Sequence, residues 1–264
     1  MGDIVVDPLP WDEMVTIPAG PFIMGNDNGA EIERPQHVVT LPTFRIGRYP
    51  VTNRQYLRFL RDGGYTEPRW WLPEGWAWVK QMKIDSPALW RHPLYARPEQ
   101  PVVGVSWYEA AAYARWWSER TGRRFRLPTE AQWERVARGT EGRTWPWGDR
   151  FEPGRCNTAE AKNGQPTAAN AFANGKTPEG VYDLSGNVWE WCRTRWGRTL
   201  QTLEYPYPYN PADGRDDEEE RYVRIIRGGS WFDLWPQASP TNRRRYLADA
   251  RSNNIGFRLV EERD

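Results

Sequence analysis

The chain has 264 residues and a formal net charge of +1, so it has no overall electrostatic attraction to nucleic acid or to a membrane surface. With 17 Trp, 12 Tyr and 8 Phe, its core is expected to be largely aromatic. Basic residues are nearly all Arg, which fits either a GC-rich genome or a thermostable protein from a hot habitat.

The first residues, 1–8, contain neither a basic region nor a long apolar run. We therefore expect no signal peptide and no membrane span, which predicts a cytoplasmic protein. The two cysteines, Cys156 and Cys192, are too few for a disulfide framework. Two buried free thiols are favoured over a single bridge.

Short apolar runs predict four strands near the N-terminus, at residues 14–17, 21–25, 37–41 and 44–47. Three capping boxes then mark helix starts, each with a hydroxyl at the N-cap and Gln or Glu three residues later. The N-caps are Thr52, Ser106 and Thr129. Residues 65–101 are dense in Trp and Pro, which predicts a long ordered loop held by ring packing.

The second half of the chain is predicted to be mostly irregular. Residues 157–180 have few apolar side chains and must be fixed by hydrogen bonds or a metal. Residues 180–191 predict a turn leading into a strand, and residues 223–227 predict a strong strand. The acidic run 213–220 is predicted to be a solvated loop tip rather than a binding site.

The C-terminal segment, residues 227–260, differs from the rest of the chain. Two short anchors bracket an insert at 232–250 that has neither a helical nor a strand period, so no regular element is predicted there. The insert is rich in Arg, aromatic and short polar residues, a composition that suits a contact surface.

Eight motifs together resemble the formylglycine-generating-enzyme, or sulfatase-modifying factor, domain. In chain order they are FIMG (22–25), YPVTN (49–53), PVVGVSW (101–107), RLPTEAQWE (126–134), WPWG (145–148), GNVWEW (186–191), RGGSW (227–231) and IGFR (255–258). The resemblance covers nearly the whole chain. It implies one α+β domain over residues 1–264, with a C-type-lectin-like fold, short antiparallel sheets, two main helices and much ordered loop.

The family that the chain resembles includes copper-dependent oxidases, iron-dependent sulfoxide synthases and proteins that only bind, so fold alone does not give function. The oxidases hold Cu(I) with two thiols. The position of the first thiol falls near Asp233 in this chain, and no Cys occurs after Cys192. The sulfoxide synthases add a His-rich domain, whereas this chain has only His37 and His92, interpreted as a strand and a loop residue. No motif singles out a carboxylate pair. These comparisons predict no copper, no iron and no enzymatic activity.

The resemblance also implies a structural calcium site. Asp183, the carbonyl groups of Gly186 and Val188, and Glu190 match positions that bind calcium in the family. Mixed carbonyl and carboxylate ligation is what Ca²⁺ prefers. The alternative is a turn in which Asn187 bonds its own backbone and Glu190 forms a salt bridge with an Arg.

The bracketed insert is most similar to the variable proteins of diversity-generating retroelements. In that system, change at the adenines of Asn codons reaches Phe, Asp, Leu, Ala, Ser, Thr, Arg, Tyr, His or Gly, but not Trp, Gln, Glu, Lys or Met. Trp235 and Gln237 are therefore predicted to be fixed. Residues 232–250 contain no Lys, Glu or Met, as this rule requires.

This resemblance implies a non-enzymatic protein that binds an unknown protein ligand through the 232–249 surface. A glycan ligand is less favoured, because no lectin-type Glu-Pro-Asn triplet is present. The predicted contact residues are Trp231, Phe232, Asp233, Leu234, Ser239, Thr241, Arg244, Arg245, Tyr246, Leu247 and Asp249. The alternatives are a formylglycine-generating-enzyme-like oxidoreductase with a rearranged, thiol-free site, or a degenerate regulatory domain of that family.

Overall fold

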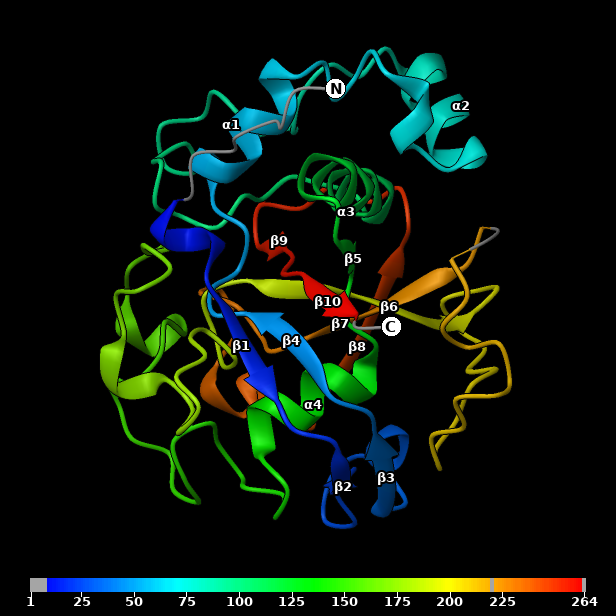
Figure 1. Ribbon diagram of the computed structural model, residues 1–264. Coiled ribbons are helices and arrows are strands. Elements are labelled where there is room, and N and C mark those ends of the chain that lie inside the picture. Colours follow the sequence, from blue (N-terminus) through cyan, green and yellow to red (C-terminus); the bar gives the residue numbers. More distant parts are fainter. Residues whose placement is uncertain (1–8, 219–220, 263–264) are drawn as a thin grey trace.

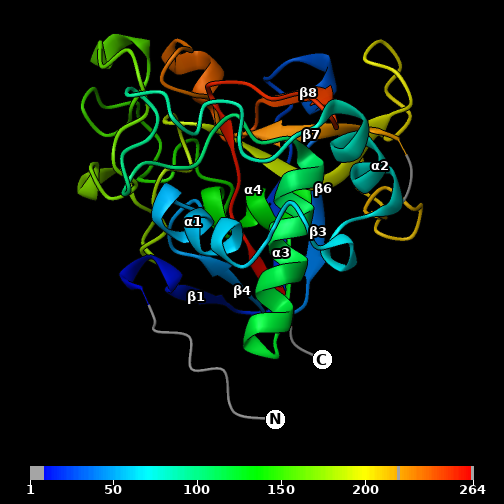
Figure 2. The ribbon, with the colours of Figure 1, turned by 90° about the horizontal axis from the view of Figure 1, so that it is seen from above.

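The computed structural model describes residues 9–218 and 221–262 (Figure 1). The predicted α+β class is confirmed, because these described residues form short strands in three sheets and four α-helices (Figure 2). The helices are α1 (Asn53–Arg61), α2 (Pro73–Met82), α3 (Trp107–Thr121) and α4 (Glu130–Arg138). Figure 1 shows α1, α2 and α3 on one side of the central strands and α4 on the other side.

The first sheet has the order β1-β4-β10-β5 and joins the two ends of the described chain. Its strands are β1 (Met14–Ile17), β4 (Phe44–Gly47), β10 (Val260–Glu262) and β5 (Arg124–Arg126). All of its pairs are antiparallel, and Val260 lies between Ile46 and Arg126. The C-terminal strand is thereby fixed in the middle of this sheet.

The second and third sheets carry the remaining strands. The second pairs β2 (Gly20–Met24) with β3 (His37–Leu41). The third has the order β8-β7-β6-β9, with β8 (Arg243–Leu247), β7 (Val223–Arg227), β6 (Trp189–Gly197) and β9 (Ile255–Gly256). Strands β6 and β9 pair in parallel, whereas the other pairs are antiparallel.

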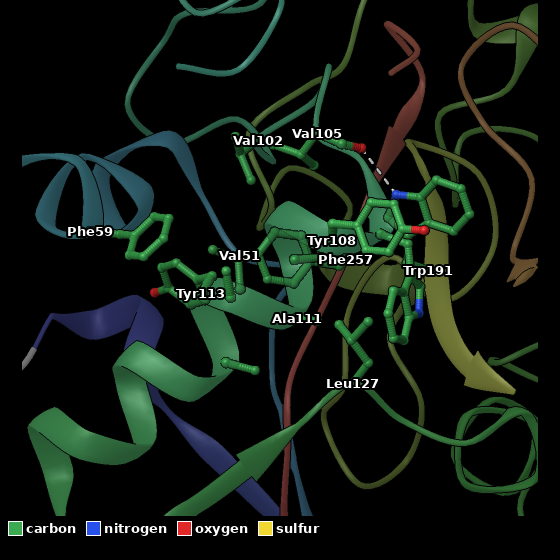
Figure 3. Packing of buried hydrophobic residues seen from close by; sticks show 14 of the residues in the cluster. Val51, Phe59, Val102, Val105, Tyr108, Ala111, Tyr113, Leu127, Trp191 and Phe257 are labelled. Atoms are coloured by element: carbon green, nitrogen blue, oxygen red, sulfur yellow. Dashed lines mark hydrogen bonds between the residues drawn. The ribbon is translucent and has the colours of Figure 1, made fainter. Parts of the chain in front are cut away.

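The core between α1, α3 and the third sheet is aromatic, as the composition predicts (Figure 3). Tyr56 stacks on Tyr113 with ring centroids 5.4 Å apart, and Phe257 meets Tyr113 edge-on at 5.4 Å. The buried Trp191 donates its Nε1–H to the carbonyl of Val105 at 3.0 Å. The ring N–H of Trp191 is therefore satisfied inside the core rather than at its surface.

The three predicted capping boxes are confirmed. The N-cap hydroxyls of Thr52, Ser106 and Thr129 each accept the backbone N–H three residues later. Of these helices, α3 is the longest, and Gly122 ends it in the left-handed region at φ 64°.

The prediction of one long loop over residues 65–101 is wrong at α2. Pro73 stands at the first helical position, where its missing N–H costs nothing, and Glu74 follows in the first turn. The dense Trp residues hid this helix, because Trp71, Trp76 and Trp78 pack on neighbouring rings instead of forming one apolar stripe. Strands β1 and β2 are consecutive in the chain but belong to different sheets.

The prediction that the insert contains no regular element is also wrong, because residues 243–247 form strand β8. This strand pairs along its full length with β7, from Val223 opposite Leu247 to Arg227 opposite Arg243. Its inward positions include arginines rather than apolar residues, so the period of two is hidden in the hydropathy pattern.

The acidic run 213–220 is not a solvated tip over its described part. Asp213 pairs with the buried Arg215 at 2.7 Å, and Glu218 pairs with Arg115 at 3.1 Å. Residues 219–220 of this run lie outside the described residues, as do residues 1–8. Within the part of the chain that the structure describes, no helix has both the length and the apolar character that a bilayer crossing requires.

Candidate functional site

The C-terminal segment enters the surface through a tight turn after β7. Gly228 and Gly229 have φ of 100° and 73°, which favour glycine. A Cβ on Gly229 would lie 2.5 Å from the Cα of Ala238, so no larger residue fits there. The Gly-Gly pair therefore folds the loop 230–238 back onto the body of the protein.

Buried arginines anchor the segment at three points. Arg227 bonds Glu134 at 2.6 Å and also bonds Glu130. Arg243 reaches Glu130 at 2.7 Å, and Arg258 reaches Glu190 at 2.6 Å. Burying such ions is costly unless each is paired and hydrogen-bonded, as these are, so the anchors fix one geometry for the segment.

The loop between the anchors is held by its own polar side chains. Asp233 accepts hydrogen bonds from Ser230 Oγ and, at 2.8 Å, from the Nε1–H of Trp189 on β6. Asn254 donates to Ser230 Oγ at 3.1 Å, which connects the loop to the strand β9 region. Asp233, near which the resemblance to the copper oxidases places their first thiol, is therefore a hydrogen-bonded structural carboxylate here.

A cluster of rings supports the outer part of the loop. Trp235 stacks on Phe151 with centroids 5.0 Å apart and meets Trp145 at 5.8 Å. Its backbone N–H donates to Glu160 at 3.2 Å. Sequence reasoning missed this support, although the WPWG motif at 145–148 was a signal that it existed.

The eleven predicted contact residues divide by exposure. Six are exposed: Phe232, Leu234, Arg244, Tyr246, Leu247 and Asp249. Four are half-buried: Trp231, Asp233, Ser239 and Arg245. Thr241 is buried and bonds Ser239 at 3.1 Å. The structure therefore offers a smaller surface than the sequence predicted, formed by the loop 232–234 and by Arg244 and Tyr246 on the outer side of β8. The exposed Leu247 alternates with Arg243 and Arg245 and so lies on the other side of the strand.

The exposed arginine of β8 lies on an aromatic support. The guanidinium of Arg244 lies over the ring of Trp189 at 5.6 Å from its centroid. Arg245 points the other way, over Trp196 at 4.4 Å, and donates to the carbonyl of Leu200 at 2.7 Å. Of the two neighbouring arginines, Arg244 is the one that is exposed to solvent. Sequence reasoning missed Trp189 as its support.

The predicted calcium residues carry other contacts. Glu190 accepts from Arg258 through both carboxylate oxygens at 2.6 Å, and also from Trp133 at 2.8 Å. Asp183 accepts from the side chain of Asn187 at 2.7 Å. A guanidinium on Glu190 stands where a cation would need that carboxylate, so the set as arranged does not fit calcium. The alternative salt bridge is present, and calcium binding stays a prediction.

Burial changes the protonation chemistry of this turn. It raises the pKa of Asp183 to about 7, because desolvation outweighs the hydrogen bond from Asn187 and the charge of Arg258. Asn187 lies at φ 64° and accepts the backbone N–H of Thr167 at 2.9 Å. The polar half of the chain is thus fixed by hydrogen bonds between loops.

Both cysteines are free and buried, as predicted. Burial raises the pKa of Cys156 to about 12 and also raises the pKa of Cys192. Neither thiol ionises readily, and the thiolate is the nucleophilic form. His37 lies on β3, where its Nε2 accepts the backbone N–H of Tyr209 at 2.8 Å. His92 accepts a loop N–H at 3.3 Å, so both histidine predictions are confirmed.

Comparison with known sequences gives one family match over almost the whole chain. The model of the sulfatase-modifying factor enzyme 1-like domain matches residues 2–263. Hercynine oxygenase of Mycolicibacterium smegmatis is 34% identical over 240 residues, which are 82% of this chain and 54% of that protein. This chain therefore spans about half the length of that relative. The inactive C-alpha-formylglycine-generating enzyme 2 of Mus musculus is 35% identical over 94% of this chain and 85% of its own.

Solved structures confirm the C-type-lectin-like fold of this family. PvdO from Pseudomonas aeruginosa matches with a TM-score of 0.69 and 27% identity over 95% of this chain and 94% of its own. Treponema denticola variable protein 1 matches with a TM-score of 0.66 and 20% identity over 95% of both chains. At that identity the second likeness concerns the fold alone.

These relatives correct one expectation. The chain was predicted not to be an enzyme, because it lacks the thiol pair and the His-rich domain. That prediction is wrong as it stands, since hercynine oxygenase and formylglycine-generating enzyme, both enzymes, are among its relatives.

Proposed function

Because this chain belongs to the family of sulfatase-modifying factor enzyme 1-like domains, we propose that its C-terminal segment is the diversified surface of a retroelement variable protein. The exposed side chains of residues 232–249 bind a target protein. The remainder of the domain holds that surface in one geometry.

The observation that supports this proposal compares two properties of each contact residue. One is whether change at the adenines of an Asn codon can produce that residue type, and the other is whether the side chain is exposed. The six exposed contact residues named above are all of types that adenine-directed change produces. Trp235, which such change does not produce, is 42% exposed but is stacked on Phe151 at 5.0 Å. A fixed residue therefore supports the loop, and six changeable residues face outward, whereas the changeable Thr241 is buried.

The chemistry of the surface suits a protein target. Phe232 is 70% exposed, Tyr246 is 44% exposed, and Arg244 lies between solvent and the Trp189 ring. Aromatic residues and arginine dominate the energetics of protein interfaces, because they bury large rigid surfaces and add directed hydrogen bonds. The anchored loop and strand lower the entropy lost on binding.

Sequencing of the 3′ end of the gene and its downstream flank tests the proposal. We expect a near-copy of codons 227–260 beside a reverse-transcriptase gene, differing almost only at adenines. The differences should fall at Phe232, Leu234, Arg244, Tyr246 and Leu247, and spare Trp235. A flank without such a copy contradicts the proposal.

A second candidate is the substrate-binding half of an oxidoreductase. The observation in its favour is that the chain matches about half the length of hercynine oxygenase at 34% identity. Calorimetry with hercynine, the compound in that protein's name, tests it. Binding that Tyr246→Ala abolishes and Val38→Ala preserves would support it, since Val38 is 69% exposed on a strand of another sheet. No heat of binding to the folded chain would exclude hercynine as the ligand.

A further inference from the structure

Strand β8 is an outer strand of the third sheet, because only β7 lies beside it in the order β8-β7-β6-β9. Its pairing with β7 is continuous from Arg243 to Leu247, without a bulge. Successive residues of an antiparallel strand direct their backbone N–H and C=O groups alternately to the two sides. Part of the β8 backbone therefore points away from β7.

The outward backbone groups of β8 are available to a further strand. Within residues 9–218 and 221–262, the backbone of residues 243–247 makes one hydrogen bond outside its pairing with β7, in which the Ala250 N–H donates to the Leu247 carbonyl. Arg244, Tyr246 and Leu247 are exposed, whereas all five residues of β7 are buried. An unpaired edge of this kind is a template for another extended chain.

The edge also carries positive charge that its neighbours do not neutralise. Arg244 lies over the Trp189 ring, and Arg245 donates to the carbonyl of Leu200. In the described part of the chain, no carboxylate lies within salt-bridge distance of either arginine. The exposed Asp249 is the nearest acid in the sequence, and it follows the end of the strand.

These charges discriminate between partner strands. A second copy of β8 that paired with the first would bring the exposed arginines of both copies together, and like charges on facing strands are destabilising. An acidic strand would instead gain opposite-charge pairs across the junction. The edge therefore opposes self-pairing and favours an acidic chain.

We propose that β8 binds an extended, acidic segment of the target protein, which pairs with it as a further strand of the third sheet. This inference rests on the proposed function and specifies how the target is held. Backbone hydrogen bonds to β8 supply affinity that does not depend on which side chains occupy the outer positions. Acidic residues of the segment lie beside Arg244, and an apolar residue packs on Tyr246, since these two side chains share one side of the strand.

Calorimetry with synthetic peptides tests this edge. The probe is a short peptide of alternating glutamate and valine with blocked ends. Two comparison peptides carry either methyl groups on the backbone nitrogens or lysine in place of glutamate. We expect the first peptide to bind and both comparison peptides to bind about tenfold more weakly or not at all, because one lacks backbone donors and the other places cations beside arginines. Hydrogen exchange of residues 243–247 should slow in the complex.

A pair of matched variants locates the binding on the protein. Arg244→Gln should weaken binding of the glutamate peptide about threefold, because one opposite-charge pair across the strands is lost. Arg61→Gln is the control, since Arg61 is an exposed arginine at the end of α1, which packs on α3. It should leave binding unchanged. Circular dichroism checks that both variants are folded.

Several results would overturn this assignment. They are equal weakening by Arg244→Gln and Arg61→Gln, equal binding of the methylated peptide, and a folded chain that does not bind the glutamate peptide. A dimer in sedimentation that protects residues 243–247 from exchange would assign the edge to a second copy instead. Failure of the peptide beside an intact near-copy in the gene flank removes the edge proposal alone, whereas a missing near-copy removes the diversified surface whatever the peptide does.

Discussion

Trp189 donates its indole N–H to the carboxylate of Asp233 at 2.8 Å, which ties the loop after β7 to strand β6. The same indole ring carries the guanidinium of Arg244 on its face. One side chain therefore orients both parts of the exposed surface, the loop 232–234 and the edge of β8.

Replacing Asp233 with Ala should loosen this loop. The buried Trp189 N–H would lose its acceptor, which costs about 1–3 kcal/mol of unfolding free energy. Asp233→Asn keeps an acceptor oxygen and should cost less. Urea denaturation gives the two free energies, and hydrogen exchange of residues 230–235 should quicken in the Ala variant. Equal exchange in both variants and the parent would contradict the anchoring role.

Arg243 and Arg244 are neighbours on β8 but should respond differently to truncation. Arg243→Ala removes a buried partner of Glu130 and should cost about 3–5 kcal/mol. Arg244→Ala removes an exposed cation over a ring and should cost about 1 kcal/mol or less. Thermal or denaturant unfolding of both variants checks the difference. Similar losses would mean that the strand does not separate an inner side from an outer side.

The turn at Gly229 should tolerate no side chain. Gly229→Ala combines a left-handed backbone with a Cβ 2.5 Å from the Cα of Ala238, and should cost about 3 kcal/mol or more. Gly154→Ala is the control, because Gly154 has φ of 84° but open space around its Cβ. It should cost only about 1–2 kcal/mol of backbone strain. A cost for Gly229→Ala no greater than that of the control would rule out the close approach.

The buried Asp183 should give the stability a pH dependence. Its folded pKa of about 7 lies above its ordinary value of 3.8, so the folded state holds a proton that the unfolded state has released. The free energy of unfolding should therefore fall as the pH rises from about 4 to about 7, by at most about 1.4 kcal/mol per pH unit from this group. Below the lower value and above the upper value its contribution is constant.

The variant Asp183→Asn isolates that group. Asparagine keeps an acceptor for the Asn187 amide and does not titrate, so the fall between pH 4 and 7 should become shallower. Denaturant unfolding at several pH values, in the presence of a chelator, measures the slope. An unchanged slope would show that other carboxylates dominate this range.

Calcium binding can be tested at the same turn. The contacts of Glu190 with Arg258 and Trp133 predict that added Ca²⁺ leaves the melting temperature unchanged at pH 8. A rise of several degrees that Asp183→Asn abolishes would show instead that the turn rearranges around the ion, as the family resemblance implies. Mg²⁺ at the same concentration controls for ionic strength.

The sequence predicts the fold in the places where the signal is local. The capping boxes at Thr52, Ser106 and Thr129 depend on contacts within four residues, so they are legible without tertiary structure. Strand β8 is not, because its inner residue Arg243 is satisfied by Glu130, which is 113 residues away, and by the carbonyl of Ile32, which is 211 residues away. In the sequence alone, a buried arginine cannot be distinguished from an exposed one, because its ion-pair partner is not known.

The same limit applies to the sites. The resemblance to retroelement variable proteins predicts Phe232 and Tyr246 as contacts, and both are exposed, whereas Thr241 is predicted with them and is buried. The carboxylate pair Glu130 and Glu134 had no distinguishing pattern among the 35 acids.

The separation of inner and outer residues along β8 has a consequence for how this protein changes over generations. Arg243 is held by the core, and Arg244 and Tyr246 contribute little to it. Substitutions at well-separated outer positions should have nearly additive and small effects on folding. Many combinations of outer residues are then compatible with one unchanged scaffold. The strand allows a large sequence space to be explored while the stability margin of the domain stays almost constant.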